Sequence, residues 1–156
     1  MNDKPLSRIK VIFLDVEGVI VSWNHIMSGK YRGDNRDVPE PHLAERVNRI
    51  LQATDAVIVL SAAMRQLFRR DLPGLREILT RGGLNTDTLI DITPRLYEER
   101  GYEIQAWLDD HPEVTDFLII DDESDMVHLM PHLLKVEDRK VGITEDDVVE
   151  AIRRLQ

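Results

Sequence analysis

Three hydrophobic runs in the sequence each end in side chains that can bind a metal ion or a phosphate group. Asp15 follows the first run, Ser61 the second, and the pair Asp121 and Asp122 the third. Carboxylate oxygens are ligands that Mg²⁺ prefers, and this cation is typically held by one or two carboxylates together with substrate phosphate. If the fold brings the three run ends together, the sequence predicts a Mg²⁺ site that handles a phosphorylated substrate.

The expected clustering of carboxylates supports a cation. Two carboxylates about 4 Å apart repel by about 4 kcal/mol at an effective dielectric near 20. Without help, one of them would take up a proton. The alternative is that Asp121 or Asp122 caps a helix beginning near Glu123, and that Ser61 caps the helix after it. Capping explains any single residue well, but the recurrence at three run ends favours a shared site.

The elements that position these residues follow from the hydrophobic pattern. Residues 10–15, 56–60 and 116–120 are apolar runs rich in β-branched and aromatic residues, as expected of strands buried on both faces. Helical spacing occurs at 39–52, 72–80, 101–109 and 144–155, and further strands are predicted at 133–136 and, more weakly, 89–92. We therefore predict a single α/β domain over 1–156, with a mainly parallel sheet that binds ligand at the carboxyl ends of its strands.

The composition fits this interpretation. The 156 residues are 42% hydrophobic and 31% charged, which is typical of a globular protein. The sequence has no cysteine, which excludes disulfides and thiolate chemistry, and its apolar runs are too short for a membrane span. We expect a soluble, cytoplasmic protein. The net charge of −9 opposes tight binding to a nucleic-acid backbone.

The sequence Asp-Val-Glu-Gly-Val-Ile at 15–20 resembles the first motif of the haloacid dehalogenase (HAD) superfamily. Ser61 matches the second motif of that superfamily, and the pair Asp121 and Asp122 matches the fourth. The third motif is a Lys or Arg upstream of the fourth, for which Arg100 is the best candidate. The resemblance implies a three-layer (α/β/α), Rossmann-like HAD fold with a minimal cap.

The similarity is greatest to one branch, the HAD domains associated with Swiss Army Knife RNA repair proteins, and it covers nearly the whole chain. The segments that carry it are Leu-Ser-Ala-Ala-Met-Arg at 60–65, Thr-Pro at 93–94, Arg-Gly-Tyr-Glu-Ile at 100–104, Trp-Leu at 107–108, Asp-Asp at 121–122 and Gly-Ile-Thr at 142–144. Each segment alone is weak evidence, but the combination is specific. Met64 differs from the Trp that is usual in this branch.

The resemblance implies a phosphatase that acts through an aspartyl-phosphate on Asp15. Ser61 would bind the nonbridging phosphoryl oxygens, and Arg100 would neutralise the remaining negative charge. Mg²⁺ would be held by Asp15, Asp121 and Asp122 together with the backbone carbonyl of residue 17, and would act as a Lewis acid. A substrate contact by Arg65 rests instead on its position four residues after Ser61 on one helix face.

Glu17 is the main departure from the superfamily pattern, which places a second Asp there as general acid and base. Its side chain is longer by one methylene, and a displacement of about 1 Å can cost on the order of a hundredfold in rate. Activity is therefore expected to be reduced or altered. The alternative function is a catalytically impaired module that binds phosphate or a partner.

Residues 18–38 follow the first motif and are predicted to form a flap or short cap loop that contains Trp23 and Lys30. A site with so small a cap favours a large substrate, such as a nucleic-acid end or a protein, over a small metabolite. Of these possibilities we expect a nucleotide or nucleic-acid-end phosphate. The aromatic residues are scattered along the sequence, which does not predict a base-stacking platform; Trp107 is expected in the core. A response-regulator receiver is a third possibility, but its acidic pair should lie near the N-terminus.

Overall fold

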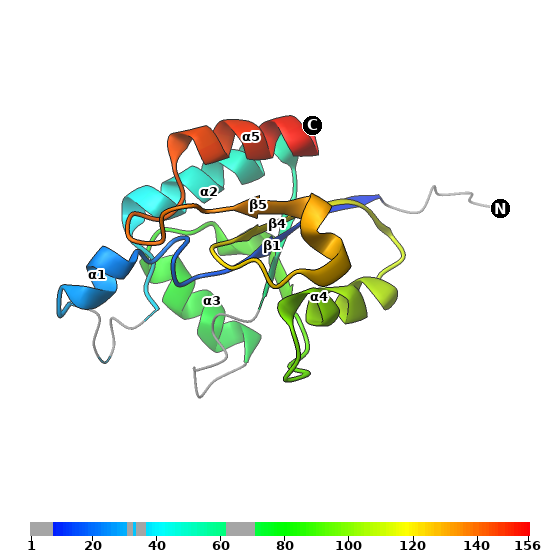
Figure 1. Cartoon of the computed structure of the whole chain (residues 1–156). Coiled ribbons are helices and arrows are strands. Elements are labelled where there is room, and N and C mark those ends of the chain that lie inside the picture. The colour runs from blue at the N-terminus through cyan, green and yellow to red at the C-terminus, as the bar shows by residue number, and fades with distance from the viewer. Residues whose placement is uncertain (1–7, 31–32, 34–36, 62–70) are drawn as a thin grey trace.

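The structure is a computed structural model that describes residues 8–30, 33, 37–61 and 71–156, and it is an α/β fold (Figure 1). Its strands are β1 (Ile9–Leu14), β2 (Val57–Leu60), β3 (Leu89–Ile92), β4 (Val114–Asp121) and β5 (Leu133–Lys135). Its helices are α1 (Trp23–Met27), α2 (Pro41–Thr54), α3 (Leu72–Arg81), α4 (Arg100–Asp109) and α5 (Glu145–Leu155). Two short 3-10 helices are η3 (Thr86–Thr88) and η4 (Val127–His132).

The five strands form one parallel sheet in the order β3-β2-β1-β4-β5. The chain moves outward from β1 to β3, then returns to the other side of β1 to form β4 and β5, so the direction of winding reverses between β1 and β4. This arrangement confirms the predicted Rossmann-like fold with a parallel sheet. A receiver sheet has the order 2-1-3-4-5, so that alternative is wrong.

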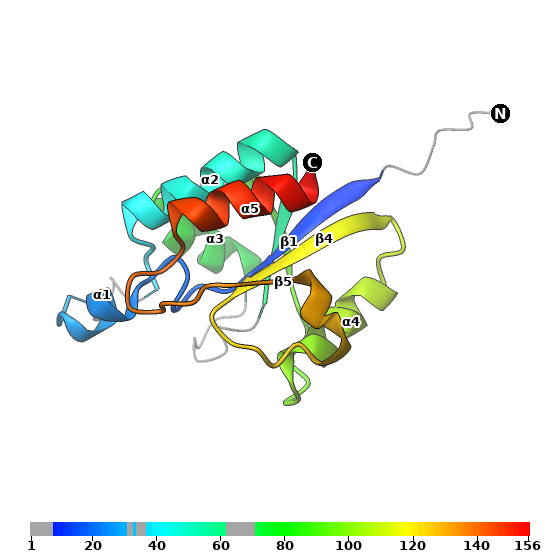
Figure 2. The ribbon, with the colours of Figure 1, turned by 45° about the horizontal axis from the view of Figure 1, so that its top comes forward.

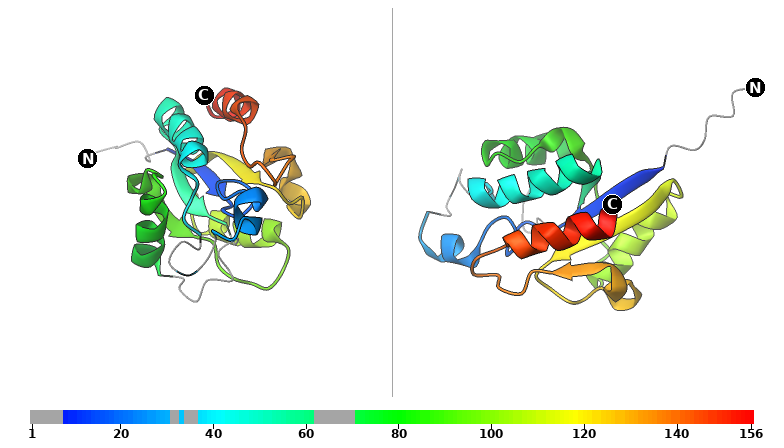
Figure 3. Two further views of the ribbon diagram at one scale, coloured as in Figure 1. Left: turned by 90° about the vertical axis from the view of Figure 1, so that its left-hand side faces the viewer. Right: turned by 90° about the horizontal axis from the view of Figure 1, so that it is seen from above.

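Helices cover both faces of the sheet. The larger apolar cluster joins α2, α3 and α5 to one face, with Ile12, Leu14 and Ile58 among its sheet residues. The smaller cluster joins α4 and η4 to the opposite face through Phe13 and Trp107. Figures 2 and 3 show α2 and α5 side by side over the sheet, with α4 on the far side. The strands are therefore buried on both faces, as their continuous apolar runs predict.

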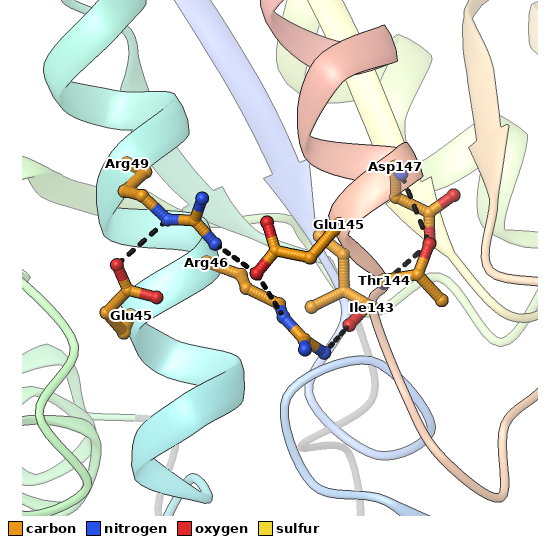
Figure 4. Close-up of polar contacts among 7 residues, drawn as sticks. All are labelled: Glu45, Arg46, Arg49, Ile143, Thr144, Glu145 and Asp147. Carbon is orange, nitrogen blue, oxygen red and sulfur yellow. Dashed lines mark hydrogen bonds and ion pairs between the residues drawn. The ribbon is translucent and has the colours of Figure 1, made fainter.

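The link between α2 and α5 is partly polar (Figure 4). Glu145, the first residue of α5, accepts hydrogen bonds from Arg46 (3.2 Å) and Arg49 (2.6 Å) of α2. Thr144 caps α5 through a reciprocal pair of hydrogen bonds with Asp147, so the predicted helix start is confirmed. These contacts hold the end of the chain against the helix that follows the first motif.

Two differences from the sequence prediction concern the loops. No helix was predicted at 23–27, where α1 lies within the segment predicted as a flap. No helix begins near Glu123, because residues 122–126 form an irregular loop before η4, so the helix-capping explanation of Asp121 and Asp122 is wrong. The helix predicted after Ser61 falls outside the described residues. Among the residues described, no helix is both long enough and apolar enough to cross a membrane.

Candidate functional site

The predicted site residues lie at the carboxyl ends of the three central strands. Asp15 directly follows β1, Ser61 directly follows β2, and Asp121 is the last residue of β4. The backbone N–H of Asp15 donates to Ile120 of β4 (3.0 Å), and that of Ser61 donates to Leu14 of β1 (3.0 Å). The two residues are thus still held by the sheet just beyond the strand ends. They border the point at which the winding direction reverses, where open α/β sheets bind their ligands.

Three carboxylates gather there. One oxygen from each of Asp15, Asp121 and Asp122 lies within 4.8 Å of the others, and all three side chains are buried. The predicted convergence of Asp15 with the pair Asp121 and Asp122 is therefore confirmed. A hard cation takes oxygen ligands from such a set and offsets their mutual repulsion, so the donor residues fit a metal ion such as Mg²⁺.

Gly18 makes room for this cluster. It has a φ of +84°, which side-chain-bearing residues rarely adopt, and a Cβ built on it would lie 2.6 Å from Cγ of Asp122. Its N–H donates to the carbonyl of Val21 (2.7 Å), which closes the tight loop after β1. Glycine is required here for both reasons, backbone conformation and close approach of the carboxylate.

Arg100 contacts two members of the acidic cluster. Its Nη1 donates to Oδ2 of Asp121 and lies 3.4 Å from Oδ2 of Asp15. The side chain is almost buried, and its Nε has no hydrogen-bond partner among the described residues. Arg100 is the first residue of α4, and its N–H donates to the carboxylate of Asp125 (3.2 Å). The structure therefore brings the predicted third-motif residue to the acidic cluster.

The electrostatics reflect burial and crowding. Burial raises the pKa of Asp15 well above its usual value, the negative charge of Asp121 raises it further, and the Arg100 guanidinium opposes both effects. Burial also raises the pKa of Asp121. Burial alone would lower the pKa of Arg100, but the charges of Asp15 and Asp121 outweigh it and raise that pKa. Arg100 and the partly exposed Arg139 bring two positive charges to three buried acids, so the cluster favours an additional cation.

Ser61 offers an unused hydroxyl. Its side chain is buried, and Oγ has no hydrogen-bond partner among the described residues. Because buried polar atoms are normally paired, such a hydroxyl is a candidate for binding substrate. Glu17 is half-buried beside Gly18 in the loop after β1. Arg65 lies outside the described residues, so its predicted role stays a prediction.

Two residues near the cluster were not singled out from the sequence. Asp125 binds the backbone of Arg100, and Arg139 places its Nε 3.3 Å from Oδ2 of Asp122. Arg139 lies in the loop between β5 and α5 and also approaches Glu123 (3.4 Å). No motif identified Arg139, because its relation to Asp122 depends on how that loop folds back over the end of the sheet.

Comparison with known proteins agrees with this geometry. A profile of HAD domains in Swiss Army Knife RNA repair proteins matches residues 11–148, a range that contains Asp15, Ser61, Arg100 and the pair Asp121 and Asp122. No curated protein and no solved structure gives a significant match. The sequence match covers most of the chain, and the sheet order agrees with a Rossmann-like HAD core. The chain therefore belongs to the family of HAD domains found in Swiss Army Knife RNA repair proteins.

Proposed function

We propose that this protein is a Mg²⁺-dependent phosphohydrolase that acts through an aspartyl-phosphate on Asp15. The observation that carries the proposal is the convergence of Asp15, Asp121 and Asp122, with oxygens within 4.8 Å of one another, against the buried guanidinium of Arg100. HAD domains are usually phosphohydrolases, and this chain is a HAD domain. The donor set, the cation beside it and the family support the same chemistry.

In the proposed reaction, a carboxylate oxygen of Asp15 attacks phosphorus and the bond from phosphorus to the leaving oxygen breaks. The other groups hold the reactants. The N–H of Val16 donates to Oδ1 of Asp15 (2.9 Å), which fixes the orientation of the carboxylate. The hydroxyl of Ser61 and the guanidinium of Arg100 bind the phosphoryl oxygens, where negative charge remains throughout the transfer. The bond formed is a mixed anhydride between Asp15 and the phosphoryl group.

Glu17 supplies the proton in this proposal. Its carboxyl protonates the leaving oxygen in the first half-reaction, and in the second it takes a proton from the water that attacks the phospho-aspartate. Inorganic phosphate and free Asp15 result. Mg²⁺, held by Asp15, Asp121, Asp122 and the backbone carbonyl of residue 17, would supply charge neutralisation at the phosphoryl group. A weaker form of the proposal, in which Glu17 has stopped turnover, leaves a module that binds phosphate.

We further propose nucleotide or nucleic-acid-end phosphates as the substrate class. The support is the family, whose domains occur in Swiss Army Knife RNA repair proteins. The net charge of −9 weakens general affinity for a polyanion, which favours recognition of a single terminal phosphate over long backbone tracking.

The test is release of inorganic phosphate from a panel of phosphoesters, including mononucleotides and oligonucleotides with 3′ or 5′ phosphate ends, with Mg²⁺ and with a chelator. We expect turnover that needs Mg²⁺ and that Asp15→Asn abolishes. Trapping of ³²P on the wild-type chain, and not on Asp15→Asn, would establish the covalent step. Activity that survives Asp15→Asn would contradict the proposal, because the reaction would then come from another site.

A further inference from the structure

We propose that Trp23 and Arg139 form a subsite that binds the nucleobase next to the phosphate being removed. This inference rests on the proposed function, because it assigns the part of the substrate that the phosphate site does not hold. Trp23, in α1, and Arg139, in the loop before α5, are 116 positions apart by their numbers, yet the Arg139 guanidinium lies 5.9 Å from the centre of the Trp23 ring. The same guanidinium lies beside Asp122.

The backbone fixes this pairing. The first N–H groups of a helix have no partner within the helix, and in α1 those of Trp23 and Asn24 donate to the carbonyls of Arg139 (2.9 Å) and Lys140 (3.2 Å). Figures 1 and 3 show α1 beside the loop between β5 and α5. The backbones of Trp23 and Arg139 are therefore held side by side.

The flanking turns hold both segments in place. Ser22 caps α1, its hydroxyl accepting from the N–H of His25 (3.2 Å), and its own N–H donates to the carboxylate of Glu40 at the start of α2 (2.7 Å). In the other loop, Asp138 accepts from the N–H of Lys140 through its side chain (2.9 Å). The aromatic ring and the guanidinium are thus carried on backbone that is anchored to the rest of the fold.

Both side chains reach solvent. Trp23 is 38% exposed, although tryptophan is a costly residue to leave in water, and the side chain of Arg139 is 43% exposed. The guanidinium carbon lies over the Trp23 ring at 5.9 Å from its centre, which is at the outer limit of a cation–π contact and farther than in a closely stacked pair. In proteins that bind single-stranded nucleic acids, the bases stack on aromatic rings and on arginine guanidinium planes.

Arg139 connects the Trp23 ring to the proposed phosphate site. Arg139 bridges the ring of Trp23 to Oδ2 of Asp122, and Asp122 belongs to the cluster that is proposed to handle the phosphate. A phosphate at the acidic cluster would therefore carry its sugar toward Arg139 and its base toward Trp23. The guanidinium would also offset part of the negative charge that repels a polyanionic substrate from this acidic protein.

The test compares two ligands that differ only in the base, adenosine 5′-monophosphate and ribose 5-phosphate. Binding is measured by calorimetry with Mg²⁺ on the Asp15→Asn variant, which prevents turnover. We expect the nucleotide to bind roughly 5- to 100-fold more tightly than the sugar phosphate, since base–aromatic stacking contributes that much. Trp23→Ala should bring the ratio close to one, and Trp23→Phe, which keeps a ring, should retain most of it.

The control is Met27→Ala, which removes an exposed apolar side chain (77% exposed) from the same helix and should leave the ratio unchanged. Equal binding of the two ligands by the parent variant would overturn the subsite while leaving the phosphate site intact. A preference for the nucleotide that Trp23→Ala does not reduce would overturn it as well. Base-dependent binding by a wild-type protein that releases no phosphate would support the subsite and count against the proposed hydrolysis.

Discussion

The carboxylate of Asp125 caps the first residue of α4 from a different part of the chain. Oδ2 of Asp125 accepts a hydrogen bond from the N–H of Arg100 (3.2 Å), and the backbone carbonyl of Asp125 accepts one from the N–H of Gly101 (3.0 Å). Gly101 packs directly on the backbone of Met126, with no space for a Cβ. The loop after β4 that begins with Asp122 thus fixes the start of α4, and with it the backbone that carries the Arg100 side chain to Asp15.

Asp125→Ala should therefore impair the site as well as the helix. Loss of a helix cap costs about 1 kcal/mol of unfolding free energy. If Arg100 also shifts, kcat falls further, because a displacement of about 1 Å can cost on the order of a hundredfold. Asp125→Asn keeps an acceptor oxygen and should recover part of both losses. A destabilised Asp125→Ala variant with unchanged kcat would show that Asp125 supports only the helix.

Gly18→Ala should disable the acidic cluster. The added Cβ meets the Asp122 carboxylate, and the φ of +84° adds backbone strain, so we expect a loss of more than about 1 kcal/mol together with weaker Mg²⁺ binding. Gly83→Ala is the matched control, because Gly83 has a φ of +93° and open space where its Cβ would be. Melting temperatures measured with and without Mg²⁺ separate the two effects. Backbone strain lowers stability in both variants, whereas contact of the new Cβ with Asp122 weakens Mg²⁺ binding only in Gly18→Ala. Equal Mg²⁺ effects in the two variants would contradict the proposed collision.

Mg²⁺ should stabilise the folded protein, because it binds carboxylates that repel one another in the native state. The gain is about 2.7 kcal/mol when the free ion is at a hundredfold excess over its Kd. Asp122→Asn should reduce the shift in melting temperature. Asp110→Asn alters an exposed carboxyl at the opposite end of α4 from Arg100 and should leave the shift intact. The metal assignment is wrong if millimolar Mg²⁺ leaves the wild-type melting temperature unchanged.

Glu17 separates a working enzyme from a phosphate-binding module. In a working enzyme, Glu17→Gln removes the proton donor and should lower hydrolysis by a factor of about 10² to 10⁴, whereas Glu17→Asp should reduce it or change the preferred substrate. In a binding module, wild type and Glu17→Gln are equally inactive, and Glu17→Asp restores turnover. Steady-state kinetics on the best phosphoester distinguishes the two. Full activity in Glu17→Gln would remove Glu17 from the proposed mechanism.

The contact between α2 and α5 should depend on pH. Hydrogen bonds from Arg49 lower the pKa of Glu145 from its usual value of 4.5, and those from Arg46 add to the effect. A lowered folded-state pKa stabilises the protein above the unfolded pKa, and this contribution is lost as pH falls through the folded pKa. Glu145→Gln should therefore lower the melting temperature slightly at pH 7, and the difference from wild type should close in acid.

The control for that pH series is Glu77→Gln, which changes an exposed carboxyl on α3. It should leave the melting temperature almost unchanged across the same range, because exposed charges without ideal partners contribute little. A difference between wild type and Glu145→Gln that is the same at pH 7 and at about pH 2 would mean that the carboxylate charge is not what links the two helices.

The sequence by itself determined the strands and the residues that follow them. Continuous apolar runs report burial on both faces, and parallel strands place their carboxyl ends at one edge, so Asp15, Ser61 and Asp121 could be predicted to converge. The helix starts at Thr144 and Leu72 also followed from local signals. Strand runs and helix starts depend on residues that are close together in the sequence, so they can be predicted from the sequence alone.

Only the tertiary structure decided which loops meet at that edge. The capping of α4 by Asp125, the contact of Gly18 with Asp122 and the approach of Arg139 to Trp23 each join segments that are separated in sequence. Their geometry is fixed by the packing of the whole sheet and its helices, in which a change of a few ångströms would break every one of these contacts. No periodicity or motif encodes such distances, so the contacts between the loops around the site could not be predicted from the sequence.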